Sequence, residues 1–456
     1  MSIAEAKYLE VIDRKSAELT ELASGVWKTP ELAFHEERSA ARIKKFLKDN
    51  GFTVEENVAG LPTAFVASFG SGKPEVGFIA EFDALSDMSQ QPLATRPAKL
   101  AGEPHGHGCG HHLYCGGAVA AALAVKEYLS STGKSGTVKV LGCPGEEGGS
   151  GKAYMAAAGV FSNLDAALGG HPESMWAVRT RGSLACCTVL YKFDGVAAHA
   201  GTRAYLGRSA LDAVELMNVA VNFLREHMPL DNRVHYAVTD GGGSAPNVVQ
   251  AHAEVLYMMR GKDNASLKKL CRRVELCAKA AAMATETTMT DEFESGSSNL
   301  ITIPTLQKTL DRAMRDLELP KPTEAEIAYA KELIKTMPER DPELPLYASE
   351  VLPIPDTIAP HFGSTDTGDV SWNCPTVQMH VASWVVGTPG HSWQAVAQGL
   401  NGFALRAMLY AGKAQALAAI RLMEAPELLA EARREHRQKT GGKYDPVLPP
   451  GHKPKL

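Results

Sequence analysis

Short apolar runs alternate with longer segments of helical periodicity in the first part of the chain. Residues 65–69 and 76–80 are apolar and are bounded by glycine and proline, which is typical of strands buried in a sheet. Residues 137–142 repeat this pattern, residues 115–129 predict an alanine-rich helix packed on the sheet, and residues 4–50 predict two helices. Strands that alternate with helices indicate an α/β fold, with a mixed, largely parallel sheet flanked by helices.

The alternation changes after residue 187, where a strand is followed by a helix, two strands, a second helix and a last strand. This β-α-β-β-α-β order is that of a small α+β sandwich, which we interpret as an inserted domain. Its predicted elements cover residues 189–195, 209–226, 235–239, 254–260, 266–285 and 287–293. The chain then returns to the first domain. We therefore expect a first domain made of residues 1–187 and 304–456, with residues 188–303 inserted.

Side chains of metal-binding types follow several of the predicted strands. Glu81 and Asp83 come after the second apolar run, Glu146 and Glu147 after the third, and His171 at the end of another. Open α/β sheets collect ligands at the carboxyl ends of their strands. Two adjacent glutamates among glycines are costly to bury unless a cation neutralises them. Asp83 is a candidate site residue, although a turn or helix-capping role fits it equally well.

The stretch from His105 to His112 has four histidines and one cysteine in eight residues. Its three glycines let the backbone turn tightly, so that Cys109 and His111 can reach one ion or two adjacent ions. Imidazole and thiolate suit a borderline ion such as zinc. His391, after a later apolar run, adds one more ligand type. The competing interpretation of the stretch is a solvated histidine-rich loop.

Composition and charge narrow the classes of function. The 456 residues are 45% hydrophobic and 22% charged, with a formal net charge of -5 and a pI near 6.3. Because basic residues do not outnumber acidic ones, we expect neither nucleic acid nor an anionic membrane as a partner. The first residues lack the apolar core of a signal peptide, so we expect a cytoplasmic protein. The eight cysteines should stay thiols, most of them in the core.

A set of separated motifs follows an order found in a known family: Cys109-Gly-His111, Glu146-Glu147, His171-Pro172 and His391. With these motifs the chain resembles, over essentially its whole length, the dinuclear metal amidohydrolases that include aminoacylases and glutamate carboxypeptidases. Within them it is similar to the aminobenzoyl-glutamate hydrolases and the plant indole-acetyl-amino-acid hydrolases. The resemblance implies a catalytic domain with an inserted lid and dimerisation domain. It also implies metal-dependent hydrolysis of the amide bond of an N-acyl or aminobenzoyl amino acid, with a dipeptidase or carboxypeptidase activity as the alternative.

The resemblance also implies roles for individual residues. It implies two divalent ions, zinc or manganese, with Glu146 as the general base. The implied metal ligands are Cys109, His111, Glu147, His171 and His391. In the inserted domain, His199 would stabilise the oxyanion, and the implied substrate-binding residues are Asn247, Arg260, Gly363 and Ser364. A homodimer or higher homo-oligomer is implied, in which His199 enters the neighbour's site, and a second, different subunit is permitted.

One residue departs from the family pattern. Two other interpretations of the chain compete with the family resemblance. Many relatives have Asp or Asn directly after the second ligand, where this chain has His112, which could orient a ligand, bind an ion or contact the substrate. A cysteine hydrolase with Cys109 as nucleophile would leave Glu146, Glu147 and His391 without a purpose. A non-catalytic metal protein would leave Glu146 as a surplus base beside a closed site.

Overall fold

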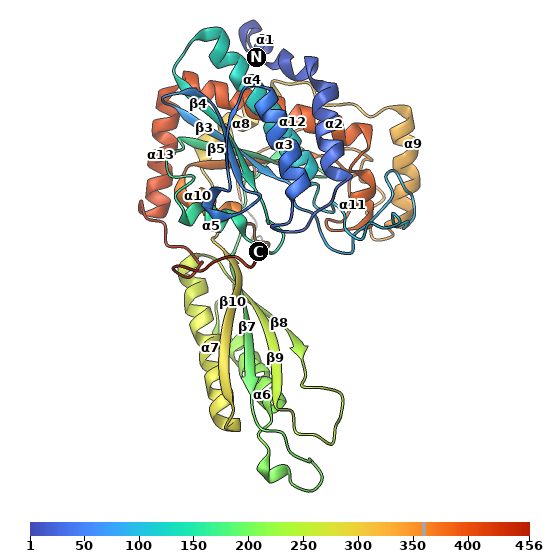
Figure 1. Cartoon of the computed structure of the whole chain (residues 1–456). Helices are drawn as coiled ribbons and strands as arrows, with labels where there is room; N and C mark the ends of the chain where they lie inside the picture. Colours follow the sequence, from blue (N-terminus) through green and yellow to red (C-terminus); the bar gives the residue numbers. More distant parts are fainter. Residues whose placement is uncertain (358–361) are drawn as a thin grey trace.

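The computed structural model describes residues 1–357 and 362–456, and it has a larger and a smaller unit (Figure 1). The larger unit contains a seven-stranded sheet. Its strands are β1 (Thr53–Glu56), β2 (Phe65–Ser71), β3 (Glu75–Glu81), β4 (Gly136–Cys143), β5 (Ala166–Glu173), β6 (Ala177–Val178) and β11 (Thr376–Ala382), in the spatial order β1-β2-β4-β3-β5-β11-β6. The central strands β4, β3, β5 and β11 run parallel, and the outer strands pair antiparallel. The predicted mixed sheet with a parallel centre is confirmed.

Helices cover both faces of this sheet. They are α1 (Ile3–Arg14), α2 (Ser16–Trp27), α3 (Glu37–Asp49), α4 (His111–Thr132), α5 (Gly151–Ala157), α8 (Pro304–Arg315), α9 (Glu324–Leu333), α10 (Thr367–Asn373), α11 (Trp393–Gln398), α12 (Gly402–Glu424) and α13 (Pro426–Thr440). Helices α4 and α12 pack together on one face, and α5 and α10 pack together on the other. Neighbouring residues of β3 alternate between the two cores, with Phe78 in the first and Ile79 in the second. Residues 4–50, predicted as two helices, form three, because α1 ends at Arg14 and α2 begins at Ser16.

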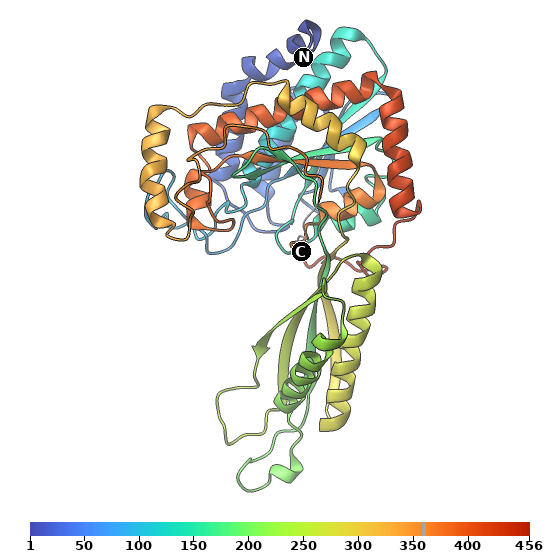
Figure 2. The ribbon, with the colours of Figure 1, turned by 180° about the vertical axis from the view of Figure 1, so that it is seen from behind.

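The smaller unit is a four-stranded antiparallel sheet covered on one face by two helices (Figure 2). Its elements are β7 (Ala185–Asp194), α6 (Ala210–Leu224), β8 (Arg233–Asp240), β9 (His252–Gly261), α7 (Asn264–Thr285) and β10 (Thr288–Ser297). The sheet order is β10-β7-β9-β8, and the unit has its own core, which includes Met217 and Tyr257. The predicted β-α-β-β-α-β order is confirmed, while the domain boundaries at residues 188 and 303 stay a prediction.

The two units are joined through neighbouring strands. β7 carries the chain into the smaller unit, and β10, its hydrogen-bonded neighbour, carries it back (Figure 1). β8, at the opposite edge of the small sheet, is exposed from His235 to Asp240. No helix in the described part of the chain is both long enough and apolar enough to cross a membrane.

Candidate metal and catalytic site

The parallel strands bring the predicted ligand types to one edge of the large sheet. β3 lies between β4 and β5 and runs in the same direction, so the carboxyl ends of the three strands lie together. Asp83 follows β3, Glu146 and Glu147 follow β4, and His171 lies near the end of β5. His111 is the first residue of α4, which starts from this edge. The sheet therefore gathers residues that are far apart in the sequence.

Gly110 allows Cys109 and His111 to approach β5 closely. Its φ is 78°, a left-handed conformation that favours glycine, and a Cβ at this position would lie 2.9 Å from Cβ of Pro172. The backbone thus turns directly against β5. As a result, Cys109 Sγ lies 3.3 Å from Nε2 of His171.

The donor atoms of the predicted ligands lie close enough together to hold ions. Three groups of side chains each place one ligand atom per residue within 4.8 Å of the others. They are Cys109 with His111 and His171, Cys109 with Glu147 and His391, and His111 with Glu146 and Glu147. Because the groups share members, the five predicted ligands and Glu146 form one connected cluster.

His391 reaches this cluster from a loop. It follows the apolar strand β11 and lies in the loop before α11, with a φ of 52°. Its Nε2 is 3.1 Å from Oε1 of Glu147. This contact between the loop and the end of β4 brings His391 into the cluster.

Asp83 connects two members of the cluster, His111 and Glu147, through hydrogen bonds. One carboxylate oxygen accepts a hydrogen bond from Nδ1 of His111 at 2.8 Å, and the other accepts one from the backbone N–H of Glu147 at 2.8 Å. Burial alone would raise the pKa of Asp83, but His111 lowers it below its ordinary value. Asp83 is therefore an ionised carboxylate that fixes the orientation of His111. Of the two interpretations open at this position, the structure supports the site residue.

The two adjacent glutamates have opposite electrostatic environments. Burial and the carboxylates of Glu81, Asp366 and Glu147 raise the pKa of Glu146 well above its usual range. Burial would also raise the pKa of Glu147, but the hydrogen bond from His391 and the nearby His111 lower it. The neighbours therefore favour a proton on Glu146 and a negative charge on Glu147.

A buried cluster of charged side chains contacts the ligand cluster through His111. The ammonium group of Lys152 is inaccessible to solvent and lies 2.8 Å from Oε1 of Glu81 and 2.6 Å from Oδ1 of Asp366. The other oxygen of Glu81 lies 3.3 Å from Nε2 of His111, yet neither of these two buried atoms has a hydrogen-bond partner within the described residues. Two unsatisfied buried acceptors that face each other are the local environment that a cation would satisfy.

A cavity of about 760 Å³ opens beside the cluster. Its walls include Cys109, Glu146, Glu147, His171, Glu173, Arg179, Ser364 and His391. This volume suits a small organic molecule with its reacting bond held beside the carboxylates and imidazoles.

The predicted residues of the inserted segment divide into two sets. Arg260, in β9, donates a hydrogen bond to Ser364 Oγ at 2.8 Å, and so reaches the cavity wall. Gly363 lies next to Ser364, and its carbonyl accepts the backbone N–H of Leu184. His199 and Asn247 lie together in exposed loops of the smaller unit, where the carbonyl of Asn247 accepts the N–H of Ala200. Within one chain, neither His199 nor Asn247 lines the cavity.

His112 lies outside the ligand groups. It is buried, and its Nε2–H donates to the carbonyl of Gly399 at 2.9 Å. His107, in ring contact with it, donates to the carbonyl of Val26. These two histidines therefore tie the start of α4 to neighbouring helices.

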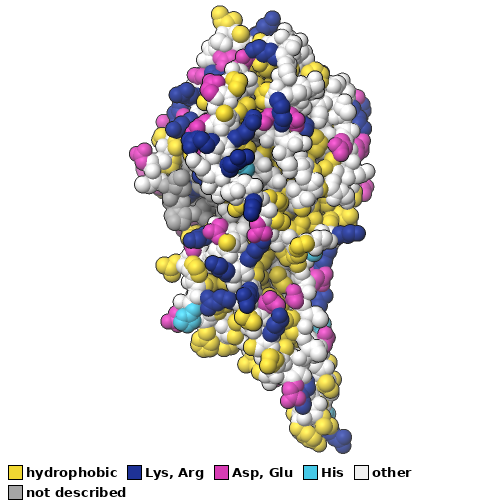
Figure 3. Space-filling model, turned by 90° about the vertical axis from the view of Figure 1, so that its left-hand side faces the viewer, with side chains coloured by type: hydrophobic (Ala, Val, Ile, Leu, Met, Phe, Trp, Pro, Cys, Tyr) yellow, Lys and Arg dark blue, Asp and Glu magenta, His cyan; other side chains and the backbone are white. Residues whose placement is uncertain are grey.

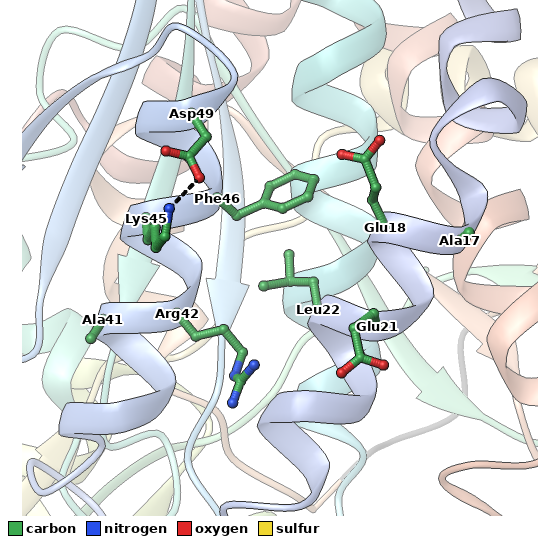
Figure 4. A pocket seen from close by; sticks show the side chains of 9 residues that line it. All are labelled: Ala17, Glu18, Glu21, Leu22, Ala41, Arg42, Lys45, Phe46 and Asp49. Carbon is green, nitrogen blue, oxygen red and sulfur yellow. Dashed lines mark hydrogen bonds and ion pairs between the residues drawn. The ribbon is translucent and has the colours of Figure 1, made fainter.

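A second pocket lies between α2 and α3 (Figure 4). Its volume is about 700 Å³, and Leu22 and Phe46 lie beside the ion pair of Lys45 with Asp49. The described residues that line it include neither histidine nor cysteine. The pocket is thus separate from the strand-end cluster and has none of its ligand chemistry.

Several residues of the site were not identified from the sequence. Lys152, Asp366 and Arg179 have no recognisable motif around them. A lysine in the apolar stretch Lys152-Ala-Tyr-Met was the available signal, because a buried lysine requires carboxylate partners.

Comparison with known proteins adds an independent line of support. Residues 77–389 match the model of the peptidase family M20/M25/M40. The chain is 40% identical over 453 residues to one of the subunits of p-aminobenzoyl-glutamate hydrolase from Escherichia coli strain K12, covering 94% of each chain. It is 32% identical to the Xaa-Arg dipeptidase of Mus musculus, over 65% of this chain and 67% of that protein.

Solved structures share the fold. The YXEP protein of Bacillus subtilis, described as a dinuclear metal binding peptidase of the M20 family, superposes with a TM-score of 0.57 at 16% identity. The superposition covers 90% of this chain and 99% of that one. At this level of identity the likeness concerns the fold, and it extends over both units.

Proposed function

The chain belongs to the peptidase family M20/M25/M40 and is a hydrolase of amide bonds, and on this premise we propose that its substrates are N-acyl or aminobenzoyl amino acids. The product would be a free amino acid. The observation that supports this proposal most directly is the connected cluster of Cys109, His111, Glu147, His171 and His391, with Glu146 beside it in a cavity. The E. coli relative is named for p-aminobenzoyl-glutamate, a substrate of this class.

The cluster is suited to two divalent ions, zinc or manganese. Imidazole, thiolate and carboxylate are all ligands for such ions, and Cys109 belongs to two of the three groups. The buried, unsatisfied Nε2 of His111 faces this cluster. When bound, such ions supply Lewis acidity toward the scissile carbonyl and lower the pKa of water. The proposed ligands are Cys109, His111, Glu147, His171 and His391.

Glu146 would act as the proton carrier. In its ionised form it would take a proton from the attacking water and pass it to the leaving amine, and the raised pKa makes that form a stronger base than an ordinary glutamate. Glu147 has the lowered pKa that suits a permanent ligand. Glu146 would therefore transfer the proton, and Glu147 would bind metal.

A cysteine hydrolase fits the same residues less well. Burial raises the pKa of the Cys109 thiol, although the nearby His111 acts against this shift. The neutral thiol, which is a poor nucleophile, is thus favoured over the thiolate.

Arg260 would hold the substrate's α-carboxylate. It stands on the cavity wall through Ser364, next to Gly363, and a guanidinium binds a planar carboxylate through two parallel hydrogen bonds. No carboxylate forms a salt bridge with Arg260 within the described residues. An incoming carboxylate would therefore meet no competing ion pair.

His199 and Asn247 would act in the site of a second copy of the chain. In the single chain both are exposed, away from the cavity. β8 is an open edge strand that includes Tyr236 and Val238, and apolar side chains such as Phe223 on α6 are also exposed. Pairing of two β8 edges across a two-fold axis would cover this edge. The opposite side of the smaller unit, which faces the viewer in Figure 3, has hydrophobic side chains among charged ones.

A different protein chain is the second option for this surface. The E. coli relative is named as one subunit of its hydrolase, so its name refers to at least one other subunit. Size measurement of the purified chain alone, followed by the same measurement with a candidate partner, would distinguish a homodimer from a mixed assembly.

A substrate panel tests the proposed activity. The purified chain, loaded with zinc or with manganese, would be incubated with aminobenzoyl-glutamate, N-acyl amino acids and dipeptides, and release of the amino acid would be measured. We expect hydrolysis that stops with a chelator and returns with metal. Activity that survives complete removal of metal would instead support the cysteine mechanism.

A further inference from the structure

Arg179 is a cation in the cavity wall, and it has no role in the proposed catalytic mechanism. It directly follows β6, and its backbone N–H donates to the carbonyl of Gln378 in β11. Its side chain is partly buried and borders the cavity. Nη1 donates to Oε1 of Gln378 at 3.2 Å, the one hydrogen bond of this side chain among the described residues.

This guanidinium lacks an anionic partner. Burial lowers the pKa of Arg179, and nearby acidic groups, including Glu146 and Glu173, offset only part of that effect. Across residues 1–357 and 362–456, no carboxylate lies within ion-pair distance of it. A guanidinium has five N–H donors, so most of those of Arg179 are free to bind a ligand. A partly buried cation with unused donors is stabilised when an anionic ligand pairs with it.

Glu173 is the one carboxylate outside the proposed catalytic cluster among the described residues of the cavity wall. It forms no salt bridge with Arg179 within the described residues, and Arg181 adds a second positive charge to the same wall. Arginine keeps its charge throughout the physiological pH range. The wall around Arg179 therefore favours an anionic ligand over a cationic one.

We propose that Arg179 binds the side-chain carboxylate of the substrate's amino acid, so that the preferred substrates are N-acyl or aminobenzoyl conjugates of glutamate or aspartate. This inference rests on the proposed function. Arg260 is supplied by β9 of the smaller unit, whereas Arg179 is supplied by the large sheet. Two arginines from separate elements, both without salt bridges among the described residues, match a ligand with two carboxylates. Conjugates of neutral or basic amino acids would leave Arg179 unpaired.

The first experiment compares matched substrates. Kinetics of metal-loaded wild type and Arg179→Gln would be measured on aminobenzoyl-glutamate, aminobenzoyl-glutamine and aminobenzoyl-arginine. For the glutamate conjugate we expect Arg179→Gln to lower kcat/KM tenfold or more, mainly through KM, because one charge-assisted contact is lost. For the glutamine conjugate we expect a change within about twofold, because that contact was absent.

Two variants serve as controls. Arg312→Gln removes an exposed arginine of α8 that does not line the cavity, and it should leave all three substrates nearly unchanged. Arg179→Lys keeps the charge but loses the fork of donors, so it should recover part of the activity on the glutamate conjugate. Equal losses on the glutamate and glutamine conjugates would overturn the proposal and make Arg179 a support for Gln378. A preference for the arginine conjugate that Glu173→Gln abolishes would overturn it as well.

A binding measurement separates this inference from the proposed activity. Calorimetric titration of the metal-loaded protein with glutarate and with its monoamide requires no turnover. We expect glutarate to bind more tightly to wild type, and Arg179→Gln to reduce that preference tenfold or more. If glutarate binds in this way while no conjugate is hydrolysed, the proposed substrates fail and the anion site stands. If hydrolysis occurs but glutarate has no advantage over its monoamide, the inference about Arg179 fails alone.

Discussion

Asp83 accepts the Nδ1–H of His111 at 2.8 Å, across 28 positions of sequence. This hydrogen bond fixes the imidazole so that its other nitrogen, Nε2, points into the cluster of carboxylates and sulfur. A histidine ligand held through its second nitrogen by a carboxylate is more basic and better oriented than a free one. The ionised state of Asp83 and its hydrogen bond to the Glu147 backbone extend this control to the end of β4.

Asp83→Asn should weaken metal binding without removing a ligand. The amide keeps the size of the side chain but loses its charge, so the affinity should fall about tenfold to a hundredfold. Competition with a coloured chelator measures this affinity. Asp87→Asn is the matched control, because Asp87 is exposed and adopts a left-handed conformation that asparagine tolerates. Equal affinity in both variants would contradict the role of Asp83.

Glu146→Gln should abolish most activity while metal content stays near that of wild type. The proton carrier would be lost but the proposed ligands kept, and the loss in kcat should be on the order of a hundredfold or more. Metal analysis of the variant, combined with turnover assays, checks both parts. An empty site in Glu146→Gln would show that Glu146 is itself a ligand.

Cys109→Ala should lower metal content before any other property changes. Cys109 belongs to two of the three ligand groups, so its loss should affect both. Elemental analysis after dialysis measures the bound metal, with Cys277→Ala in α7 as the control for loss of a thiol elsewhere. Full occupancy in Cys109→Ala would remove this residue from the ligands.

Lys152→Met should destabilise the metal-free protein strongly. The change leaves Glu81 and Asp366 buried without their cation, at a cost of about 3–5 kcal/mol, which urea unfolding would measure. Adding Glu81→Gln and Asp366→Asn should recover part of that loss, because no unpaired charge remains. A change below about 1 kcal/mol for Lys152→Met would place the group in a far more solvated environment.

Mixing two inactive variants tests whether His199 acts in a second copy. His199→Ala and Glu146→Ala should each be nearly inactive alone. In a mixed dimer, one site would combine an intact Glu146 with the partner's intact loop. Random exchange makes half of the dimers mixed, so activity should return to about a quarter of wild type. Mixtures that are shown to exchange subunits and yet stay inactive would assign His199 to its own chain or to no catalytic role.

Periodicity predicted most of the fold because the buried elements are strongly patterned. The central strands of the large sheet, the long helix after the histidine-rich stretch and the β-α-β-β-α-β unit follow from apolar spacing. The strand β1, whose residues are mostly exposed, was not predicted. The features that the apolar spacing did not predict are short elements or boundaries without glycine or proline. β6 has two residues, and the boundary between α1 and α2 falls at Lys15, where no glycine or proline marks a break.

Residue types indicated the ligand set, but only tertiary structure could identify the residues that support it. Cys109, His111 and the paired glutamates stand out in the sequence because their types and spacing are unusual. Lys152 and Arg179 do not, since a lone cation in a chain with 47 lysines and arginines has no distinguishing pattern. They matter because burial removes water from their charged groups. Burial in turn depends on how distant segments pack, which the sequence does not show.

The attachment of the smaller unit through β7 and β10 has a mechanical consequence. These two neighbouring strands fix the unit at its base, and the C-terminal tail braces it there through the ion pairs of Asp445 with Lys268 and of Lys455 with Glu294. Arg260 pairs with Cys186 close to that base, whereas His199 follows the far end of β7. For any small rotation about the attachment, the displacement grows with distance from the pivot. His199 would therefore sweep a long arc while Arg260 barely shifts, so one motion could bring a distant group into position without disturbing the cavity wall.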